Sequence, residues 1–270
     1  MRGPLVKRHR LRQMVWFIGL LAWAGTAIRA ENVIWNSAAA HTLPKGRWEI
    51  GLFQPLRYGQ TDHLEWSTHP IMNLVIPNLS VKIAHGDGAG WQLATRHQLH
   101  YPTPLLRLVS REGTGGLIAP DLDIPAILFL RSELLLTRTL GSSRQLTVKG
   151  GAALVAKTGA LDERATIDLP IIFPRMAAYR QGYQVNFGLD LVGKLLGRWG
   201  YGADMDVFFT PGFDQPFAFE HKGLALWRKN DRFQLLLGYK LTFGDYPFGE
   251  QWHLLPLLDL QWSRKRQGRQ

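Results

Sequence analysis

The stretch WHLLPLLDLQW, residues 252–262, carries a Trp at each end with mostly Leu between them. The two Trp residues are ten positions apart. Because side chains alternate along a strand, an even spacing puts both rings on the same face. A tilted strand needs about 9–11 residues to cross a bilayer, and rings at both of its ends would lie at the two headgroup layers. Four segments show this spacing, and their predicted membrane-interface rings are Trp91 with Tyr101, Phe217 with Trp227, Phe233 with Phe243, and Trp252 with Trp262.

Alternation of apolar and polar residues, interrupted by turn residues, recurs along the chain and predicts strands rather than helices. Long and short links between these segments mostly alternate, as in outer-membrane barrels with short periplasmic turns and longer outer loops. The eleven predicted strands are 47–53, 63–69, 78–84, 91–101, 126–140, 145–157, 182–194, 201–210, 216–228, 232–243 and 252–262.

We therefore expect an all-β fold, an antiparallel transmembrane β-barrel of about twelve strands, with ten as the fallback. Bacterial single-chain barrels usually have an even number of strands, and the sequence offers NVIWNSAAAH, residues 32–41, as a twelfth. The alternative fold is a soluble, exported β-sandwich. The mean hydropathy of −0.11 excludes a bundle of transmembrane helices.

The N-terminus has the pattern of a secretory signal peptide: a basic stretch, an apolar run, and then the small residues Ala27 and Ala30. An uncleaved anchor is the alternative. We predict a signal peptide over 1–30, a barrel over 31–262 and a basic tail over 263–270, with the mature protein in the cell outer membrane of a Gram-negative-type bacterium. The six basic residues of 1–30 account for the fall in formal charge from +11 to +5, and the tail holds four more. The body is therefore nearly neutral, and no nucleic-acid partner is expected.

The chain has no cysteine, which excludes disulfides, thiol nucleophiles and zinc–thiolate sites. His97 and His100 are three positions apart and so face opposite sides of a strand, which prevents both from binding one metal ion. We expect no cofactor and no metal.

Charged residues fall on the less apolar face of several predicted strands. If the barrel closes in chain order, the acids at 190, 204, 206 and 220 would form one wall of the lumen, opposite a basic wall of Arg96, Arg131 and Lys149. Such walls would orient polar solutes in a pore. The alternative is a closed lumen filled by cross-strand ion pairs. The predicted pore-lining residues are Arg96, Arg131, Glu133, Lys149, Asp190, Asp204, Asp206, Glu220, Lys222, Lys240 and Asp259.

Ser67 and His69 are two positions apart and share a strand face, which is compatible with a catalytic Ser–His pair. Neither an acid nor an oxyanion donor can be assigned to them. An ordinary pair at the end of a strand explains the spacing better, and no catalytic residue is predicted with more support than these two.

The stretch GRWEIGLFQPLRYGQTDHLEWSTHP resembles the N-terminal strand pair of poorly characterised bacterial outer-membrane β-barrel proteins that carry a Tyr-Gly-x-Thr-Asp turn. Here the turn is Tyr58, Gly59, Gln60, Thr61 and Asp62, followed by Glu65. The resemblance covers about twenty-five residues and implies a barrel whose terminal aromatic residue is read by the barrel-assembly machinery. This chain departs from that pattern, because eight residues follow Trp262.

These observations predict a passive pore or transport-associated barrel for small polar solutes, in contact with membrane lipids and lipopolysaccharide. Two alternatives stay open: a structural barrel with a closed lumen, and a hydrolase acting on lipid or lipopolysaccharide. Whether the protein is an enzyme is not settled by the sequence, and the balance is against it.

Overall fold

The computed structural model describes residues 35–141, 143–167, 169–170, 173–211, 217–246 and 249–265. The predicted signal peptide, residues 32–34 and most of the predicted basic tail lie outside the described residues.

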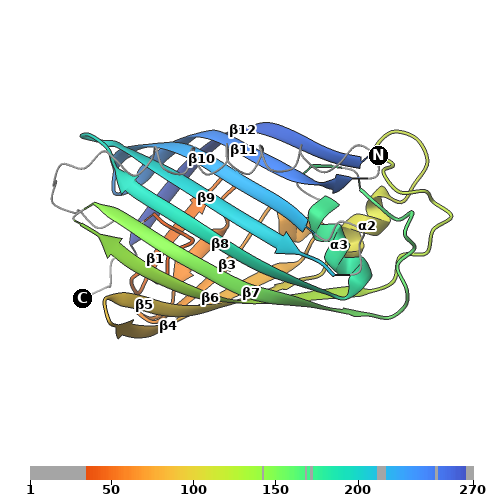
Figure 1. The fold of residues 1–270 in the computed structure, drawn as a ribbon, viewed down its shortest axis with the longest axis horizontal. Helices are drawn as coiled ribbons and strands as arrows, with labels where there is room; N and C mark the ends of the chain where they lie inside the picture. Colours follow the sequence, from red (N-terminus) through yellow and green to blue (C-terminus); the bar gives the residue numbers. More distant parts are fainter. Residues whose placement is uncertain are drawn as a thin grey trace, which may run out of the picture.

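Twelve antiparallel strands form a closed barrel in chain order, with β1 hydrogen-bonded to β12 (Figure 1). The predicted fold class is therefore confirmed. The strands are β1 (Arg47–Gly51), β2 (Leu56–Gly59), β3 (Leu64–Thr68), β4 (Asn78–Gly88), β5 (Trp91–His100), β6 (Ile127–Leu140), β7 (Arg144–Lys157), β8 (Tyr183–Lys194), β9 (Trp199–Phe209), β10 (Phe217–Asn230), β11 (Phe233–Tyr246) and β12 (Gly249–Lys265).

The twelfth strand is β2, and not the predicted segment 32–41. With four residues, β2 is too short to show an alternating pattern in the sequence. The described part of the predicted strand, residues 35–41, forms turns and bends. This segment lies inside the barrel, where the small side chains of Ala39 and Ala40 are buried. At the other end of the chain, β12 continues to Lys265, beyond the boundary predicted at residue 262.

The two ends of the barrel differ. At one end, here called the short-turn end, the links are 60–63, 89–90, 141–143, 195–198 and 231–232. The opposite end, here called the long-loop end, carries the 69–77 link with a 3-10 turn (Met72–Leu74), the 101–126 link with α2 (Thr103–Val109), and the 158–182 link with α3 (Phe173–Gln181). Figure 1 shows α2 and α3 together at this end. Among the described residues, no helix has the length and apolar character to cross a membrane.

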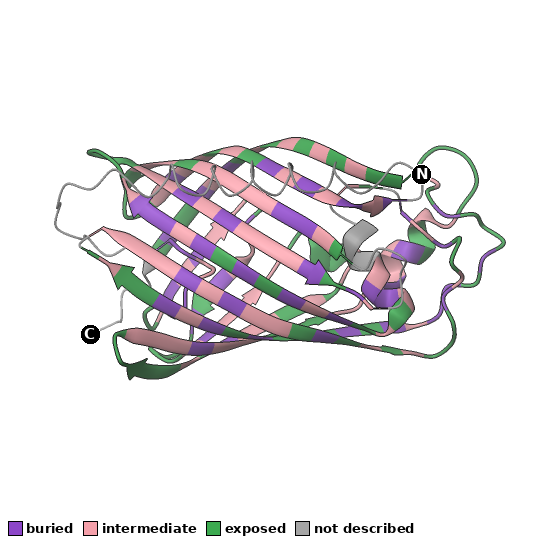
Figure 2. Cartoon of the chain, viewed as in Figure 1, coloured by how far each residue is buried: buried purple, intermediate pink, exposed green. Residues whose placement is uncertain are grey.

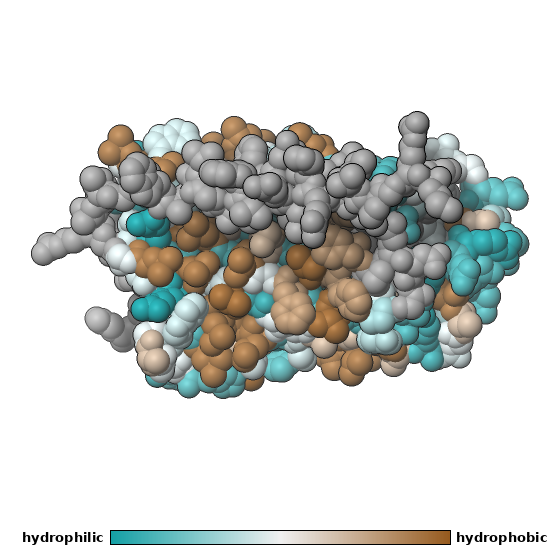
Figure 3. Space-filling view, in the orientation of Figure 1, coloured by the Kyte–Doolittle hydropathy of each residue, from teal (hydrophilic) through white to brown (hydrophobic). Residues whose placement is uncertain are grey.

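The wall of the barrel is apolar outside and polar inside, as β6 illustrates. Leu128, Leu130 and Leu134 are exposed, whereas Glu133 and Thr137, on the opposite face, are buried. This alternation repeats around the barrel (Figure 2), and apolar side chains cover the middle of the strands (Figure 3). Exposed Phe187 and Leu254 extend the apolar surface to other strands. A continuous exposed apolar surface of this kind is typical of a transmembrane barrel and untypical of a soluble protein.

The predicted interface rings lie on the outward face in two groups at opposite ends of the barrel. Phe243 lies 4.6 Å from Trp252 and 6.3 Å from Phe217, measured between ring centroids, at the long-loop end. Phe233 lies 5.8 Å from Trp262 at the short-turn end. The strand directions put Tyr101 with the first group, and Trp91 and Trp227 with the second. Contact of these rings with lipid headgroups stays a prediction.

The two long links fold over the long-loop end and pack into it. Leu106 of α2 and Ile167 of the 158–182 link join Ile127 and Phe129, which point inward from β6. The resulting apolar cluster is the main hydrophobic core among the described residues, and it covers part of the long-loop end. Elsewhere in the interior most of the buried side chains are polar or charged.

Candidate functional site

Residues 35–46, here called the N-terminal plug, run inside the barrel before β1 begins. Lys82 on β4 donates hydrogen bonds from its Nζ to the carbonyl oxygens of Ser37, Ala39 and His41, at 3.0–3.2 Å. The plug therefore uses its backbone, which has no partners within a strand ladder, to bind a buried cation.

Three further strands hold the plug. The Ala40 amide donates to Thr137 Oγ1 on β6 at 2.8 Å, and the Leu43 amide donates to Glu65 Oε2 on β3 at 2.9 Å. Asn36 Nδ2 donates to Asp190 Oδ1 on β8 at 3.0 Å. The contacts come from strands on different sides of the barrel, so the plug spans part of the lumen.

The turn that carries the family resemblance anchors the plug where it leaves the lumen. Asp62 accepts two hydrogen bonds, from Thr42 Oγ1 to its carbonyl oxygen at 2.6 Å and from the Lys45 amide to Oδ1 at 3.0 Å. A Cβ on Gly59 would overlap the carbonyl oxygens of Leu43 and Pro44. The glycine is needed here because the plug backbone passes directly over it.

A cluster of charged side chains lies on the lumen side of the short strands β1, β2 and β3 and of the neighbouring β4. Arg57 on β2 contacts Glu65 with Nε and Nη2, both at 2.8 Å, and Glu49 on β1 with Nη1 at 2.9 Å. Arg47 is 3.1 Å from Glu49, and Lys82 is 3.7 Å from Glu65. All five side chains are buried. Of these five residues, here called the β1–β4 charge cluster, the sequence pattern singles out Glu65 alone, next to the Tyr58–Asp62 turn.

The predicted pore-lining residues form ion pairs with one another. Lys149 on β7 lies 3.2 Å from Asp204 and 2.8 Å from Asp206, both on β9, and Lys222 on β10 lies 3.2 Å from the same Asp204. The pairs between β7 and β9 reach past β8, which places these side chains on the inner face. The expected division into one acidic and one basic wall is therefore wrong, because Lys149 lies among the acids.

The remaining predicted charges have local partners too. Arg96 pairs with Glu133 at 2.7 Å, and Lys240 pairs with Glu220 at 2.7 Å. Arg131 lies over the rings of Phe129 and Phe208 and donates to Gln184. Asp259 accepts from the Phe53 amide at 3.0 Å and from Gln261. The interior therefore contains many short ion pairs and hydrogen bonds between neighbouring strands. Such contacts are the ones expected from the alternative interpretation of the sequence, a lumen filled by cross-strand ion pairs.

The described residues line three cavities at different levels of the barrel. A short-turn pocket of about 380 Å³ lies between the 195–198 and 231–232 links. A central chamber of about 320 Å³ lies between Trp35–Ala38 and strands β8 to β12, and it shares Val192, Leu226, Arg228 and Gln234 with the short-turn pocket. An apolar pocket of about 380 Å³ at the long-loop end shares Pro55 with the central chamber. The short-turn pocket and the central chamber therefore adjoin along several residues, whereas the apolar pocket meets the chamber at Pro55 alone.

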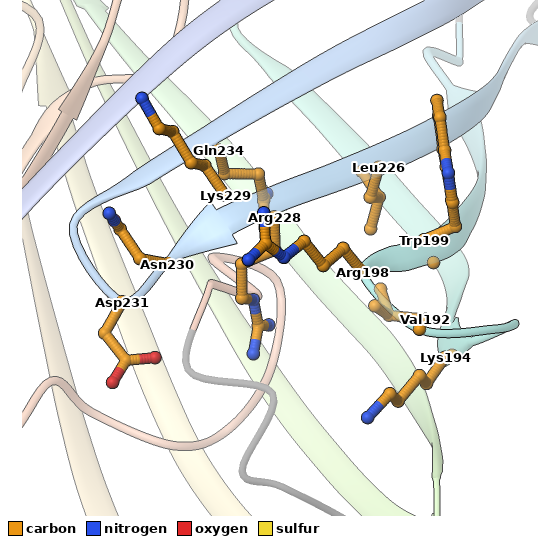
Figure 4. Close-up of a pocket in the computed structure, with 13 residues that line it drawn as sticks. Val192, Lys194, Arg198, Trp199, Leu226, Arg228, Lys229, Asn230, Asp231 and Gln234 are labelled. Atoms are coloured by element: carbon orange, nitrogen blue, oxygen red, sulfur yellow. The ribbon is translucent and has the colours of Figure 1, made fainter.

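The short-turn pocket is basic (Figure 4). Arg198 and Trp199 come from the link before β9 and its first residue, whereas Lys229 and Asp231 come from the end of β10 and the link to β11. Arg228, shared with the central chamber, brings a cation further into the lumen. The short-turn pocket therefore carries mostly positive charge, whereas the lining of the central chamber holds the acids Asp190, Asp204 and Asp259 beside Lys222 and Arg228.

Ser67 and His69 both line the apolar pocket. His69 Nε2 lies 3.1 Å from the Phe53 carbonyl oxygen. Among the described residues, no hydrogen bond joins Ser67 to His69, and none of the described groups of His, Asp or Glu side chains has the arrangement of a metal site. The arrangement therefore provides a lined pocket but not an assembled Ser–His pair.

No protein-family model and no curated protein matches this chain. Among solved structures, it is similar to the one described as the crystal structure of the P. putida toluene transporter TodX, with 10% sequence identity and a TM-score of 0.37. The similarity covers 85% of this chain and 81% of the other.

Proposed function

We propose that this protein is an outer-membrane transport barrel that passes small solutes along its lumen, with the N-terminal plug closing the path at rest. The supporting observation is that two adjoining cavities, with a third that meets them at Pro55, lie beside a plug that is held by hydrogen bonds. A plug docked in this way can leave without disturbing the strand ladders, because the barrel is closed by β1 and β12 alone.

The proposed location follows from the barrel itself. Helical membrane proteins and closed barrels are the two structures that satisfy their backbone hydrogen bonds in lipid. We propose that residues 1–30 direct export, that the short-turn end faces the periplasm, and that the long loops face outward, where lipopolysaccharide and membrane lipids surround them. Insertion by the barrel-assembly machinery belongs to the same proposal.

The test is solute flux through the purified barrel reconstituted in liposomes, with osmotic swelling as the readout. We expect slow but measurable swelling with small solutes, because the plug keeps most barrels closed. Liposomes without protein are the control. Heat-modifiable migration on a gel establishes that the reconstituted barrel is folded. Absence of flux from the folded barrel, both with the plug and without it, would overturn the transport proposal.

The second candidate is a structural barrel with a closed lumen. The buried ion pairs favour it, since such pairs fill space and stabilise neighbouring strands. It differs from the transport proposal in one outcome: removal of the plug would then give no flux.

For the lipid hydrolase, the supporting observation is that Ser67 and His69 share a pocket. If the wild type hydrolysed a lipid ester and Ser67→Ala did not, that hypothesis would be supported.

We also expect the plug to respond to pH through His41, which lies in the plug, outside the membrane-spanning strands. Burial lowers the pKa of His41 below its ordinary value, Lys82 lowers it further, and Asp87 opposes them. Its other polar neighbour is Gln145, whose Nε2 lies 3.4 Å from the His41 Nε2.

Because the docked pKa is lower than the undocked one, protonation favours undocking. Docking is thus most stable above the ordinary His pKa of 6.5 and weakens as the pH falls below it. Flux should rise between pH 8 and pH 5, and His41→Gln, which stays neutral, should reduce that rise. An equal rise in the variant would show that other groups control the response.

A further inference from the structure

We propose that the apolar pocket at the long-loop end binds a small amphipathic molecule with an aliphatic body and one hydroxyl group. This names the substrate class of the proposed transport path and rests on that function for its purpose, although binding can be measured without flux. The pocket differs from the other two cavities, whose linings carry several charged side chains.

The aliphatic part is assigned from the side chains that surround the cavity. Leu105 and Leu106 come from α2, and Met72 and Ile76 come from the link between β3 and β4. Ile167 closes the cavity from the other long link. Contact with three separate links encloses an apolar body, and burial of its surface drives binding.

The size of the cavity sets the size of the ligand. A dry apolar cavity of about 150 Å³ accepts benzene. At about 380 Å³ the pocket is more than twice as large, so a molecule such as 1-octanol fits within it.

The hydroxyl group is assigned from His69. Its Nε2 faces the Phe53 carbonyl oxygen at 3.1 Å, and since a carbonyl oxygen only accepts, Nε2 carries the hydrogen and donates. In the neutral ring, Nδ1 is then an acceptor. This atom is buried and has no hydrogen-bond partner among the described residues. A ligand hydroxyl that donates to Nδ1 would satisfy it, whereas a hydrocarbon would not.

The rim that holds His69 is fixed by hydrogen bonds. The His69 amide donates to Asn78 Oδ1 at 2.7 Å, and Thr68 Oγ1 donates to the Asn78 carbonyl oxygen at 2.8 Å. Asn73 Nδ2 donates to Thr68 Oγ1 at 2.7 Å. The rim of the pocket is therefore formed before binding, and a small shift of the His69 ring is needed for the buried Nδ1 to meet the ligand hydroxyl.

The inner wall of the pocket continues the lumen. Ser80 on β4 lies between its register partners Ser67 on β3 and Gln98 on β5, and all three line the pocket. A large side chain at Ser80 would occupy the cavity from the barrel wall without altering the long links. This makes Ser80→Phe the variant that removes the space and retains His69.

The test is titration of 1-octanol into the purified barrel in lipid nanodiscs, followed by calorimetry. Because Ser80→Phe fills the pocket, the heat that remains in this variant measures partitioning of the alcohol into lipid. Ser132→Phe makes the same substitution on the exposed face of β6, outside the pocket, and is the matched control. We expect saturable binding in the wild type and in Ser132→Phe, and at least a tenfold weaker affinity in Ser80→Phe. Equal titrations for wild type and Ser80→Phe would overturn the proposal.

The role of His69 has a separate comparison. His69→Phe should bind 1-octanol about three- to tenfold more weakly, with little change for n-octane. His97→Phe, on the next strand but one and bonded to Ser132 outside the pocket, should leave both affinities unchanged. Equal loss for the alcohol and the hydrocarbon would refute the hydroxyl assignment.

Leu105→Trp on α2 provides a second way to fill the pocket if Ser80→Phe does not give a heat-modifiable, folded barrel. Its expected result is the same loss of binding, and retained binding would count against the site. Binding without solute flux would support the pocket and refute the transport function. Solute flux without binding of 1-octanol would support the transport function and refute the pocket as a binding site.

Discussion

Deletion of residues 35–43 is expected to raise the macroscopic conductance of the reconstituted barrel about a hundredfold. Besides the two bonds to Asp62 where the plug leaves the lumen, six hydrogen bonds hold the plug inside the barrel, through Asn36, Ala40, Leu43 and the three carbonyl groups bound by Lys82. Each contributes about 0.5–1.5 kcal/mol net. Undocking therefore costs several kcal/mol, and the open fraction of the intact protein should be below about one per cent.

Planar-bilayer recordings check this expectation. Lys82→Met is the graded comparison, because it removes three of the six bonds while the plug remains attached, and it should give an intermediate conductance. Heat-modifiable migration must show that the shortened protein is folded. A folded, shortened barrel that conducts no more than the intact protein would contradict the role of the plug and favour the closed structural barrel.

Arg57→Met is expected to lower the free energy of unfolding by about 3–5 kcal/mol, the cost of leaving buried charges without their partner. Arg57 makes three hydrogen bonds of 2.8–2.9 Å to Glu49 and Glu65. Arg47 and Lys82 remain beside these carboxylates in the variant, which keeps the loss from being larger. Denaturant unfolding from lipid vesicles, followed by Trp fluorescence, measures the change.

Two comparisons isolate the charge effect. The triple variant Arg57→Met, Glu49→Gln, Glu65→Gln should recover part of the lost stability, since it removes the unpaired acids. Arg164→Met, at the exposed pairs with Asp162 and Asp121, should cause no measurable change. If Arg57→Met were as harmless as Arg164→Met, the β1–β4 charge cluster would not be a stabilising element.

The wall of the barrel is the part that the sequence predicts best, because its physical cause is local. Each residue of β6 or β11 meets either lipid or the lumen, and this alternates along the strand, as the exposed Leu134 beside the buried Glu133 shows. The same alternation placed Lys149 and Asp204 on the inner face. A strand of four residues, β2, is too short to carry such a signal, so it was missed.

The interior was less predictable, since its contacts depend on register and on distance across the lumen. Nothing in the sequence states that Lys149 on β7 reaches Asp204 past an intervening strand. The plug has no periodic pattern at all, and its Ala-rich stretch was read as a strand. A signal for it existed in Gly59 and Asp62 of the turn motif, whose backbone and side chain receive the plug.

The plug and the closure of the barrel are separate steps in the assembly of this protein. The plug directly precedes β1, and β1 meets β12 along five residue pairs to complete the circle of strands. Because the docked plug is proposed to leave a closed barrel, the same segment can also thread into one after the circle is complete. A bulky folded domain attached ahead of Trp35 should therefore leave the pairing of β1 with β12 intact and keep the plug out of the lumen.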